Sequence, residues 1–199
     1  PDSTAPDGES DKDNLLIREW GSKPIFDFPA RDHTDLGILH KSIDFEAASS
    51  ITGSRFVVLH NSFAKLQRAL TQFMIDFHVE NNGYKEVYVP YIVSADSLQG
   101  TGQLPKFSED LFKIEGNQNY YLSPTAEVPV TNLFKNKILE SKELPIKYVC
   151  HTPCFRSEAG SYGQDTKGIM RQHQFEKVEL VQAVEEDDSD SALEELTLH

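Results

Sequence analysis

The chain has 199 residues, of which 38% are apolar and 26% charged, and its formal net charge is −13. This composition excludes a disordered chain, a collagen-like fibre and a coiled coil, and it predicts one domain with a tail. No stretch approaches 18 consecutive apolar residues, so no transmembrane helix is expected. The start of the chain is acidic and poor in apolar residues, unlike a signal or transit peptide.

The negative charge is concentrated at the two ends of the chain. Residues 1–13 carry a net charge of −4 and residues 185–195 carry −7, which leaves −2 for the rest of the sequence. No run of Lys and Arg could hold a nucleic acid by charge alone. We expect residues 1–13 to be a solvated linker and, because the chain starts without Met, we expect a piece of a longer protein whose domain runs over 14–199.

The clearest predicted element is a helix over residues 61–79, after a short helix at 45–49. Its apolar side chains recur at three- and four-residue steps and form one stripe. The stripe consists of Phe63, Leu66, Leu70, Phe73, Met74 and Phe77. Asn61 or Ser62 is expected to cap the start of the helix, and Gly83 is expected to end it.

A strand is predicted next, over residues 86–93. It contains Pro90, which cannot donate a hydrogen bond to a neighbouring strand and should therefore lie at a strand end or a sheet edge. Residues 119–127 read as extended. A helix is predicted over 128–139, with Pro129 in its first turn and one apolar face formed by Val130, Leu133, Phe134 and Ile138.

The second half of the chain predicts a long hairpin. Residues 146–156 and 171–184 read as strands, joined by a polar connection that contains glycines. A last helix begins beyond them, with Ser189 or Asp190 as its cap. Strands and helices mixed with a long hairpin indicate an α+β domain with an antiparallel sheet.

The hairpin is also where chemistry is expected, because side chains alternate between the two faces of a strand. Val178 and Leu180 should point to an apolar face. The residues expected on the other face are Cys154, Arg156 and Glu158 on the first strand and Phe175, Lys177, Glu179 and Val181 on the second.

Such a face could bind a nucleotide. An Arg can hold a phosphate or carboxylate through two parallel hydrogen bonds, a Phe ring can stack on a base, and a carboxylate can accept from an amine. The same residues could form a plain solvated surface with an Arg–Glu pair. The glycine-bearing connection over 157–168, with Lys167 and Arg171 near its end, favours a polyphosphate site.

The two cysteines, Cys150 and Cys154, are too few for a disulfide-built scaffold. With His151 and His173 they could bind zinc, but their spacing matches none of the usual patterns. We expect reduced thiols packed on a strand, as in cytoplasmic proteins.

Several segments together resemble one family. TPCFRSEAGSYGQDTKGIMRQHQFEKVEL (152–180) is similar to motif 2 of class II aminoacyl-tRNA synthetases, in its seryl-tRNA synthetase form. SPTAEVP (123–129) resembles that family's serine-binding segment. Helix 61–79 with GYKEVYVPYIV (83–93) resembles motif 1, whose strand ends in proline, and TGSRFVVL (52–59) and GTGQLPKF (100–107) also match.

The resemblance implies an enzyme that activates L-serine with ATP, in the presence of Mg²⁺, to seryl-adenylate and transfers it to tRNA(Ser). It implies a class II antiparallel sheet flanked by helices and a cytoplasmic homodimer, with Pro90 of motif 1 at the subunit interface. No metal ligand of the family falls within this chain, and residues 159–170 would approach the tRNA acceptor end.

The site residues follow from the same resemblance. Arg156 corresponds to the Arg that bridges the α-phosphate and the serine carboxylate, Glu158 to the carboxylate near the adenine amino group, and Arg156 and Glu158 are the catalytic candidates. Beside them, Ser157, Arg171 and Phe175 are implied to bind ATP. The residues implied to bind serine are Thr125, Ala126, Glu127, Arg156 and Glu179.

Two parts of the family pattern are missing: the N-terminal helical arm that grips tRNA, and motif 3 with its ATP-binding Arg. The resemblance is therefore to the front of a catalytic domain, with residues 1–13 as a remnant of the connection to the arm, and the chain by itself should be inactive. Two alternatives remain at this point. One is a related enzyme that charges a carrier protein, and the other is a dimerising module without catalysis.

Overall fold

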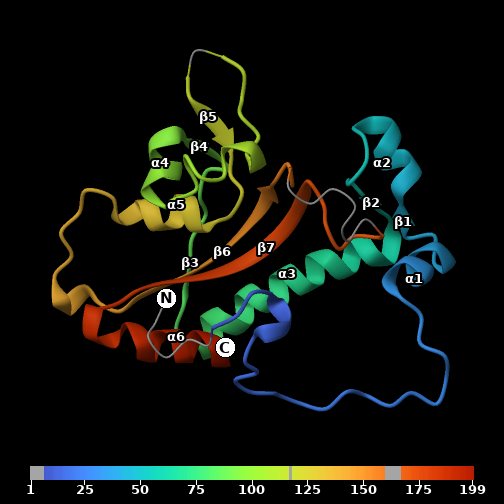
Figure 1. Ribbon diagram of the computed structural model, residues 1–199, viewed down its shortest axis with the longest axis horizontal. Coiled ribbons are helices and arrows are strands. Elements are labelled where there is room, and N and C mark those ends of the chain that lie inside the picture. Colours follow the sequence, from blue (N-terminus) through green and yellow to red (C-terminus); the bar gives the residue numbers. More distant parts are fainter. Residues whose placement is uncertain (1–6, 117, 160–166) are drawn as a thin grey trace. The chain divides into compact units, whose positions relative to one another are not determined.

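The computed structural model describes residues 7–116, 118–159 and 167–199. The chain divides into two compact units, residues 1–31 and 32–199. The described part of the first unit holds one short 3₁₀ helix, η1 (Asp11–Asp13), whose start is capped by the Ser10 hydroxyl. All remaining elements belong to the second unit (Figure 1).

The central sheet of the second unit has three strands, β3 (Lys85–Glu86), β6 (Ile146–Phe155) and β7 (Gln174–Ala183), in the order β3–β6–β7. β6 and β7 form a ten-residue antiparallel ladder, which confirms the predicted hairpin and the α+β class. β3 runs parallel to β6, so the sheet is mixed.

Short elements surround this sheet. The small antiparallel pairs are β1 (Ile43–Asp44) with β2 (Val58–Leu59), and β4 (Ile92–Ser94) with β5 (Tyr120–Leu122). The short helices are α1 (His33–Leu39), α2 (Phe45–Ile51) and α4 (Ala95–Gly100), and the 3₁₀ helices are η2 (Ser108–Asp110), η3 (Asn132–Phe134), η4 (Ser141–Glu143) and η5 (Glu186–Asp188). α2 confirms the helix predicted at residues 45–49.

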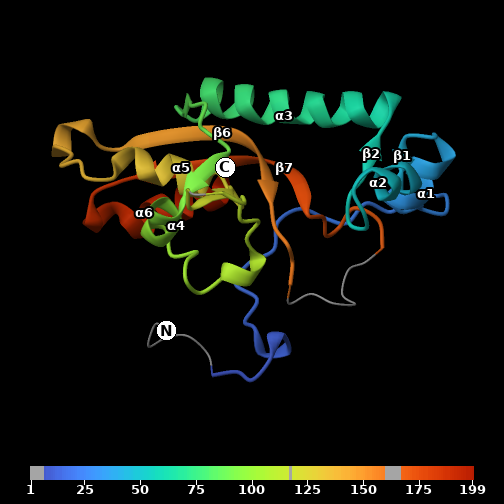
Figure 2. The same ribbon diagram turned by 90° about the horizontal axis from the view of Figure 1, so that it is seen from above.

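The long helix α3 (Asn61–Asn81) covers one face of β6 and β7, and α5 (Glu127–Thr131) lies on the other side (Figure 2). In the second half of α3 the half-buried residues are Thr71, Ile75 and His78. Their spacing of four and three residues places them on one side of the helix. The predicted apolar stripe lies beside that line and is largely exposed, with Phe73 63% accessible.

The predicted cap of α3 is wrong. Asn61 is itself the first helical residue, at a φ of 47°, and the preceding His60 makes no side-chain capping bond. The Ser62 hydroxyl instead shares a 2.9 Å hydrogen bond with Ser42. Gly83, at a φ of 71°, follows the end of the helix as expected.

The predicted strand 86–93 is in fact two strands in two different sheets. The Val87 N–H still donates to the Val149 carbonyl at 3.0 Å, after which the chain leaves β6 and pairs again only from Ile92. Pro90 lies exposed between the two strands, where its missing N–H removes no ladder bond.

The helix predicted over 128–139 is also shorter than expected. α5 ends at Thr131 and continues as η3. The Asn132 amide donates to the carbonyls of Val128 (2.8 Å) and Ser97 (3.0 Å), which satisfies the helix end, and the chain then turns away. Ile138 is therefore 96% exposed and not on the apolar face.

The last helix, α6 (Ser189–Leu198), begins at Ser189. Asp188 occupies the N-cap position and makes no side-chain capping bond. The predicted caps, Ser189 and Asp190, are therefore the first residues inside the helix. The helix itself was predicted correctly.

Two small core clusters meet at α5. One consists of Val89, Ala126, Val130 and Cys150, and the other of Val93, Leu98, Leu111 and Val128. Because α5 contributes buried side chains to both, its position is fixed against β6 on one side and against α4 and β5 on the other.

We predict that Leu98→Ala lowers the free energy of unfolding by about 2–5 kcal/mol, because Leu98 is fully buried. Ile138→Ala is the matched control, with an expected change within about 0.5 kcal/mol at an exposed position. Urea denaturation followed by circular dichroism measures both. Equal effects of the two substitutions would contradict the assigned core.

Candidate active site

The polar side chains expected on the hairpin gather on the face that α5 covers. The β6–β7 register sets three pairs side by side on that face: Cys150 with Glu179, Thr152 with Lys177, and Cys154 with Phe175. Cys150 belongs to one core cluster with Ala126, directly before α5, and with Val130 of α5, which identifies the face. The alternation predicted from the sequence is thus confirmed for both strands.

A cavity of about 380 Å³ opens on this face. It is lined by five of the predicted site residues, namely Thr125, Glu127, Arg156, Glu158 and Glu179. Asp110 and Lys177 line it as well. Four carboxylates and two cationic groups therefore face a single cavity, which suits a ligand that carries both charges.

Thr125 and Glu179 form the most tightly bonded part of the cavity. The Thr125 hydroxyl lies 2.8 Å and 3.0 Å from the two Glu179 carboxylate oxygens. The backbone N–H of Glu127, at the start of α5, donates to Glu179 Oε2 at 3.0 Å. Thr125 is buried, so the carboxylate is held in one orientation.

Lys177 completes this group. Its ammonium donates to Thr125 Oγ1 at 2.7 Å and to Glu179 Oε1 at 2.9 Å. The side chains of Lys177 and Glu179 are 29% and 19% exposed. Such a partly buried pair is screened less by salt than a surface pair.

Arg156 is held by the backbone around it. Its Nε donates to the Pro124 carbonyl at 3.2 Å, and its own N–H donates to the His173 carbonyl at 2.9 Å. The guanidinium carbon lies 5.3 Å from the centre of the Phe175 ring. Arg156 therefore connects the segment before α5 to the aromatic ring of β7.

Glu158 and Arg171 contact each other directly. Arg171 Nη1 donates to Glu158 Oε2 at 2.7 Å, between side chains that are 33% and 15% exposed. Glu158 has a φ of 52°, a left-handed conformation that is uncommon for residues other than glycine. Ser157 is turned toward the Glu109 carbonyl, and its N–H donates to the Asp110 carbonyl at 2.9 Å.

The remaining predicted residues lie around this group. Ala126 is fully buried beneath the cavity. Phe175 does not line the 380 Å³ cavity but a separate one of about 490 Å³, in which Glu176 is the charged residue of the described lining. Pro90 lies on the connection from β3 to β4 and does not line the cavity. The loop expected to approach tRNA falls largely on residues 160–166, outside the described residues.

Cys150 and Cys154 lie buried beneath the polar groups as free thiols. Burial raises the pKa of the Cys150 thiol to about 11, and burial also raises the pKa of Cys154. Among the described residues, no three His, Cys, Asp or Glu side chains are grouped so that they could hold a metal ion. None of the helices in the described ranges is long and apolar enough to cross a membrane.

Sequence reasoning assigned no role in the site to two charged residues of the cavity lining, Lys177 and Asp110. Lys177 was placed on the correct face by strand alternation, but its proximity to Thr125 depends on how α5 docks. Asp110 lies in η2 and carries no local signal. It enters the site because its carbonyl accepts from Ser157 and its carboxylate accepts from the Ala159 N–H at 2.9 Å.

Comparison with known proteins identifies the class. Residues 111–198, which include the whole hairpin, match the tRNA synthetase class II core domain (G, H, P, S and T). In fold and in sequence this region is thus similar to the core of class II aminoacyl-tRNA synthetases.

The relatives narrow this class. The chain is 61% identical over 198 residues to a serine–tRNA ligase of Methylococcus capsulatus and 58% identical over 199 residues to one of Legionella pneumophila. Among solved structures, a seryl-tRNA synthetase of Pyrococcus horikoshii complexed with ATP superposes with a TM-score of 0.90 at 34% identity, over 98% of this chain and 48% of that one. The cytoplasmic serine–tRNA ligase of Naegleria fowleri in complex with AMP gives 0.89 at 29% identity, over 97% and 46%.

Over its whole length the chain is therefore similar to seryl-tRNA synthetases. Both bacterial matches cover 100% of this chain, and it spans 46% and 47% of their lengths.

We predict that Thr125→Val destabilises the protein by about 1–3 kcal/mol, because it removes the buried hydroxyl that donates to Glu179 and accepts from Lys177. Thr125→Ser keeps the hydroxyl and is the matched control, with a smaller loss. Thermal melting of the two variants measures the difference. A Val variant as stable as the Ser variant would show that the hydroxyl contacts contribute nothing.

Proposed function

We propose that the complete gene product is a serine–tRNA ligase. It activates L-serine with ATP to seryl-adenylate and transfers the seryl group to tRNA(Ser), in the cytoplasm. The observation that carries the proposal is the single cavity in which Glu179, Thr125 and Arg156 converge. The ATP and AMP complexes of its structural neighbours support the nucleotide part.

The proposed serine site uses the Thr125–Glu179 pair. The Glu179 carboxylate, held by the Thr125 hydroxyl and the Glu127 N–H, accepts from the substrate ammonium or hydroxyl. A polar pocket of this kind rejects alanine because its groups would remain unpaired. The extra methyl of threonine gives about 1–3 kcal/mol of discrimination through packing, so a close wall is needed to exclude it.

The proposed role of Arg156 is to bridge the serine carboxylate and the α-phosphate of ATP. In the reaction a carboxylate oxygen attacks the α-phosphorus and pyrophosphate leaves, without a covalent enzyme intermediate. A guanidinium fixed by the Pro124 carbonyl stabilises the charge that develops there without reorganising. Phe175 stacks on adenine, Glu158 lies near its amino group, Ser157 belongs to the ATP site, and Arg171 faces the terminal phosphates.

The Glu158–Arg171 contact is consistent with this arrangement, since both ends of the nucleotide then meet one charged pair. Mg²⁺ would enter with the ATP phosphates. The described residues do not gather three side chains suited to hold it, so no step of the proposal runs through the metal.

We predict that Arg156→Ala in the complete gene product lowers the rate of adenylate formation by about 10²–10³-fold with a smaller effect on serine binding. Glu179→Ala acts mainly on serine, by raising its KM, because a charge-assisted contact to the ammonium is lost. Serine-dependent pyrophosphate exchange at varied serine and ATP separates the two effects.

Melting curves serve as the control for this experiment. Near-unchanged kinetics in both variants would contradict the assignment, and lost activity matched by a large drop in melting temperature would indicate a structural role instead. Charging of tRNA(Ser) by the same protein separates a tRNA ligase from an enzyme that charges a carrier protein. We expect the 1–199 chain by itself to give no exchange.

The proposed assembly is a homodimer, with Pro90 and α3 at the interface. The exposed stripe of α3 supplies apolar area for it: Leu66, Leu70, Phe73, Met74 and Phe77 are 38–63% accessible. Contiguous apolar surface of this kind marks interaction sites in soluble proteins.

We predict that the complete gene product sediments as a dimer at micromolar concentration and that Phe73→Glu weakens dimerisation at least tenfold, a loss of about 1.4 kcal/mol or more. Gln72→Glu, on the neighbouring position of the helix, is the control for added charge. A monomeric parent protein, or equal effects of the two substitutions, would be incompatible with the proposed interface.

A further inference from the structure

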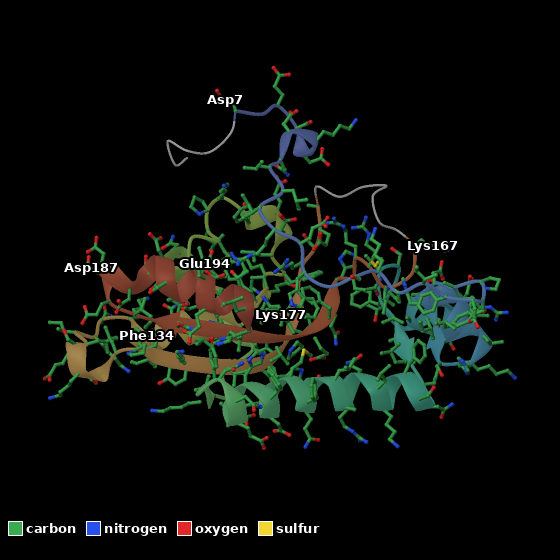
Figure 3. The ribbon with its side chains drawn as sticks, turned by 90° about the horizontal axis from the view of Figure 1, so that it is seen from below. Asp7, Phe134, Lys167, Lys177, Asp187 and Glu194 are labelled. Carbon is green, nitrogen blue, oxygen red and sulfur yellow. The ribbon has the colours of Figure 1, made fainter. Side chains whose placement is uncertain are left out.

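Glu179, the carboxylate proposed to receive the serine ammonium, already binds a cation of the protein itself, the Lys177 ammonium. Lys177 lies on β7 (Figure 3). It is two residues from Glu179 and on the same face of the strand. Its ammonium lies 2.9 Å from Glu179 Oε1 and 2.7 Å from Thr125 Oγ1. These are the two groups that the proposed function assigns to the substrate ammonium.

Two ammonium groups cannot share these acceptors at equal distance. Each is a compact, strongly hydrated cation with three donors, and the acceptors are one carboxylate oxygen and one hydroxyl. Glu179 Oε2 is already occupied by the Thr125 hydroxyl and the Glu127 N–H. A second cation within a few ångströms would be repelled, more strongly here than at an open surface. A substrate ammonium must therefore replace Lys177.

We propose that Lys177 is an internal placeholder for the substrate ammonium: it pairs with Glu179 while the site is empty, and it leaves when the amino acid binds. This rests on the proposed function, since it assumes that the Thr125–Glu179 pair receives an amino acid. Lys177 is then a positioning residue, which keeps the carboxylate oriented and neutralised between turnovers.

The cavity allows such a movement. The Lys177 side chain is 29% exposed and carries a flexible four-carbon stem. Asp110 and Glu127 line the same cavity and offer carboxylates to a displaced ammonium. The Lys177 ammonium thus stays within the cavity when serine enters. The Glu179 carboxylate has a cationic partner both in the empty site and in the occupied site.

The first test is Lys177→Met in the complete gene product. Removal of the internal competitor should lower the KM for serine by about two- to fivefold, the upper part of the range for partly exposed ion pairs, with kcat changed less. Lys177→Arg keeps the charge and should not lower KM. The matched control is Lys147→Met, which removes a similar pair with Glu195 at 2.6 Å at the far end of the same hairpin and should leave KM unchanged.

Two ligands separate displacement from a general effect on the pocket. L-serinamide keeps the ammonium and should inhibit serine-dependent exchange more tightly in Lys177→Met. L-glycerate carries a hydroxyl in place of the ammonium and should bind no better, or more weakly, since the unpaired Glu179 repels its carboxylate. Tighter binding of both ligands would overturn the proposal.

A measurement on the unmodified protein covers the case in which the Lys177 variants do not fold. Acetylation of lysines, read by mass spectrometry, should increase at Lys177 when serine is added and stay constant at Lys147. Two results would show that serine does not displace Lys177. One is reduced acetylation of Lys177 in the presence of serine, and the other is a KM for serine that is raised or unchanged in Lys177→Met. Absence of serine-dependent exchange in the parent protein would instead refute the proposed function.

Discussion

The β6–β7 register is the constraint on which the site depends. With Cys150 opposite Glu179 and Cys154 opposite Phe175, the strand residues of the site face α5 and the alternate side chains of the two strands face α3. A slip of one residue in this ladder would exchange the two faces and remove the site entirely. Ten consecutive pairs and the buried thiols on one face fix the register against such a slip.

The second constraint is the docking of α5, a helix of five residues that could not persist by itself. Its buried residues belong to both core clusters, and the segment before it is tied to β6 by the Phe155 N–H, which donates to the Ser123 carbonyl at 3.0 Å. The position of Thr125 relative to Glu179 follows from these contacts. Local helix propensity contributes little, so the serine segment depends on tertiary packing.

The sequence allowed the hairpin, the long helix and the face of each charged residue to be predicted, because all three follow from local periodicity. It failed where a distant partner decides the structure. Asn132 ends α5 by reaching the carbonyl of Ser97, and the strand around Pro90 is divided because its two halves pair with different sheets. Lys177 was assigned to the correct face, but its contact with Thr125, 52 residues earlier, could not be read from spacing.

The two thiols beneath the cavity have a consequence for its behaviour under oxidation. Cys150 and Cys154 are four residues apart on one strand, so their Cα atoms are separated by about 13 Å at 3.3 Å per residue. This exceeds the roughly 7 Å limit for a disulfide. With pKa values raised by burial, both also remain protonated and poorly nucleophilic near neutral pH. Within one chain, the two thiols beneath the cavity can therefore neither form a disulfide nor be oxidised readily. The geometry of the site does not depend on the redox state of its surroundings.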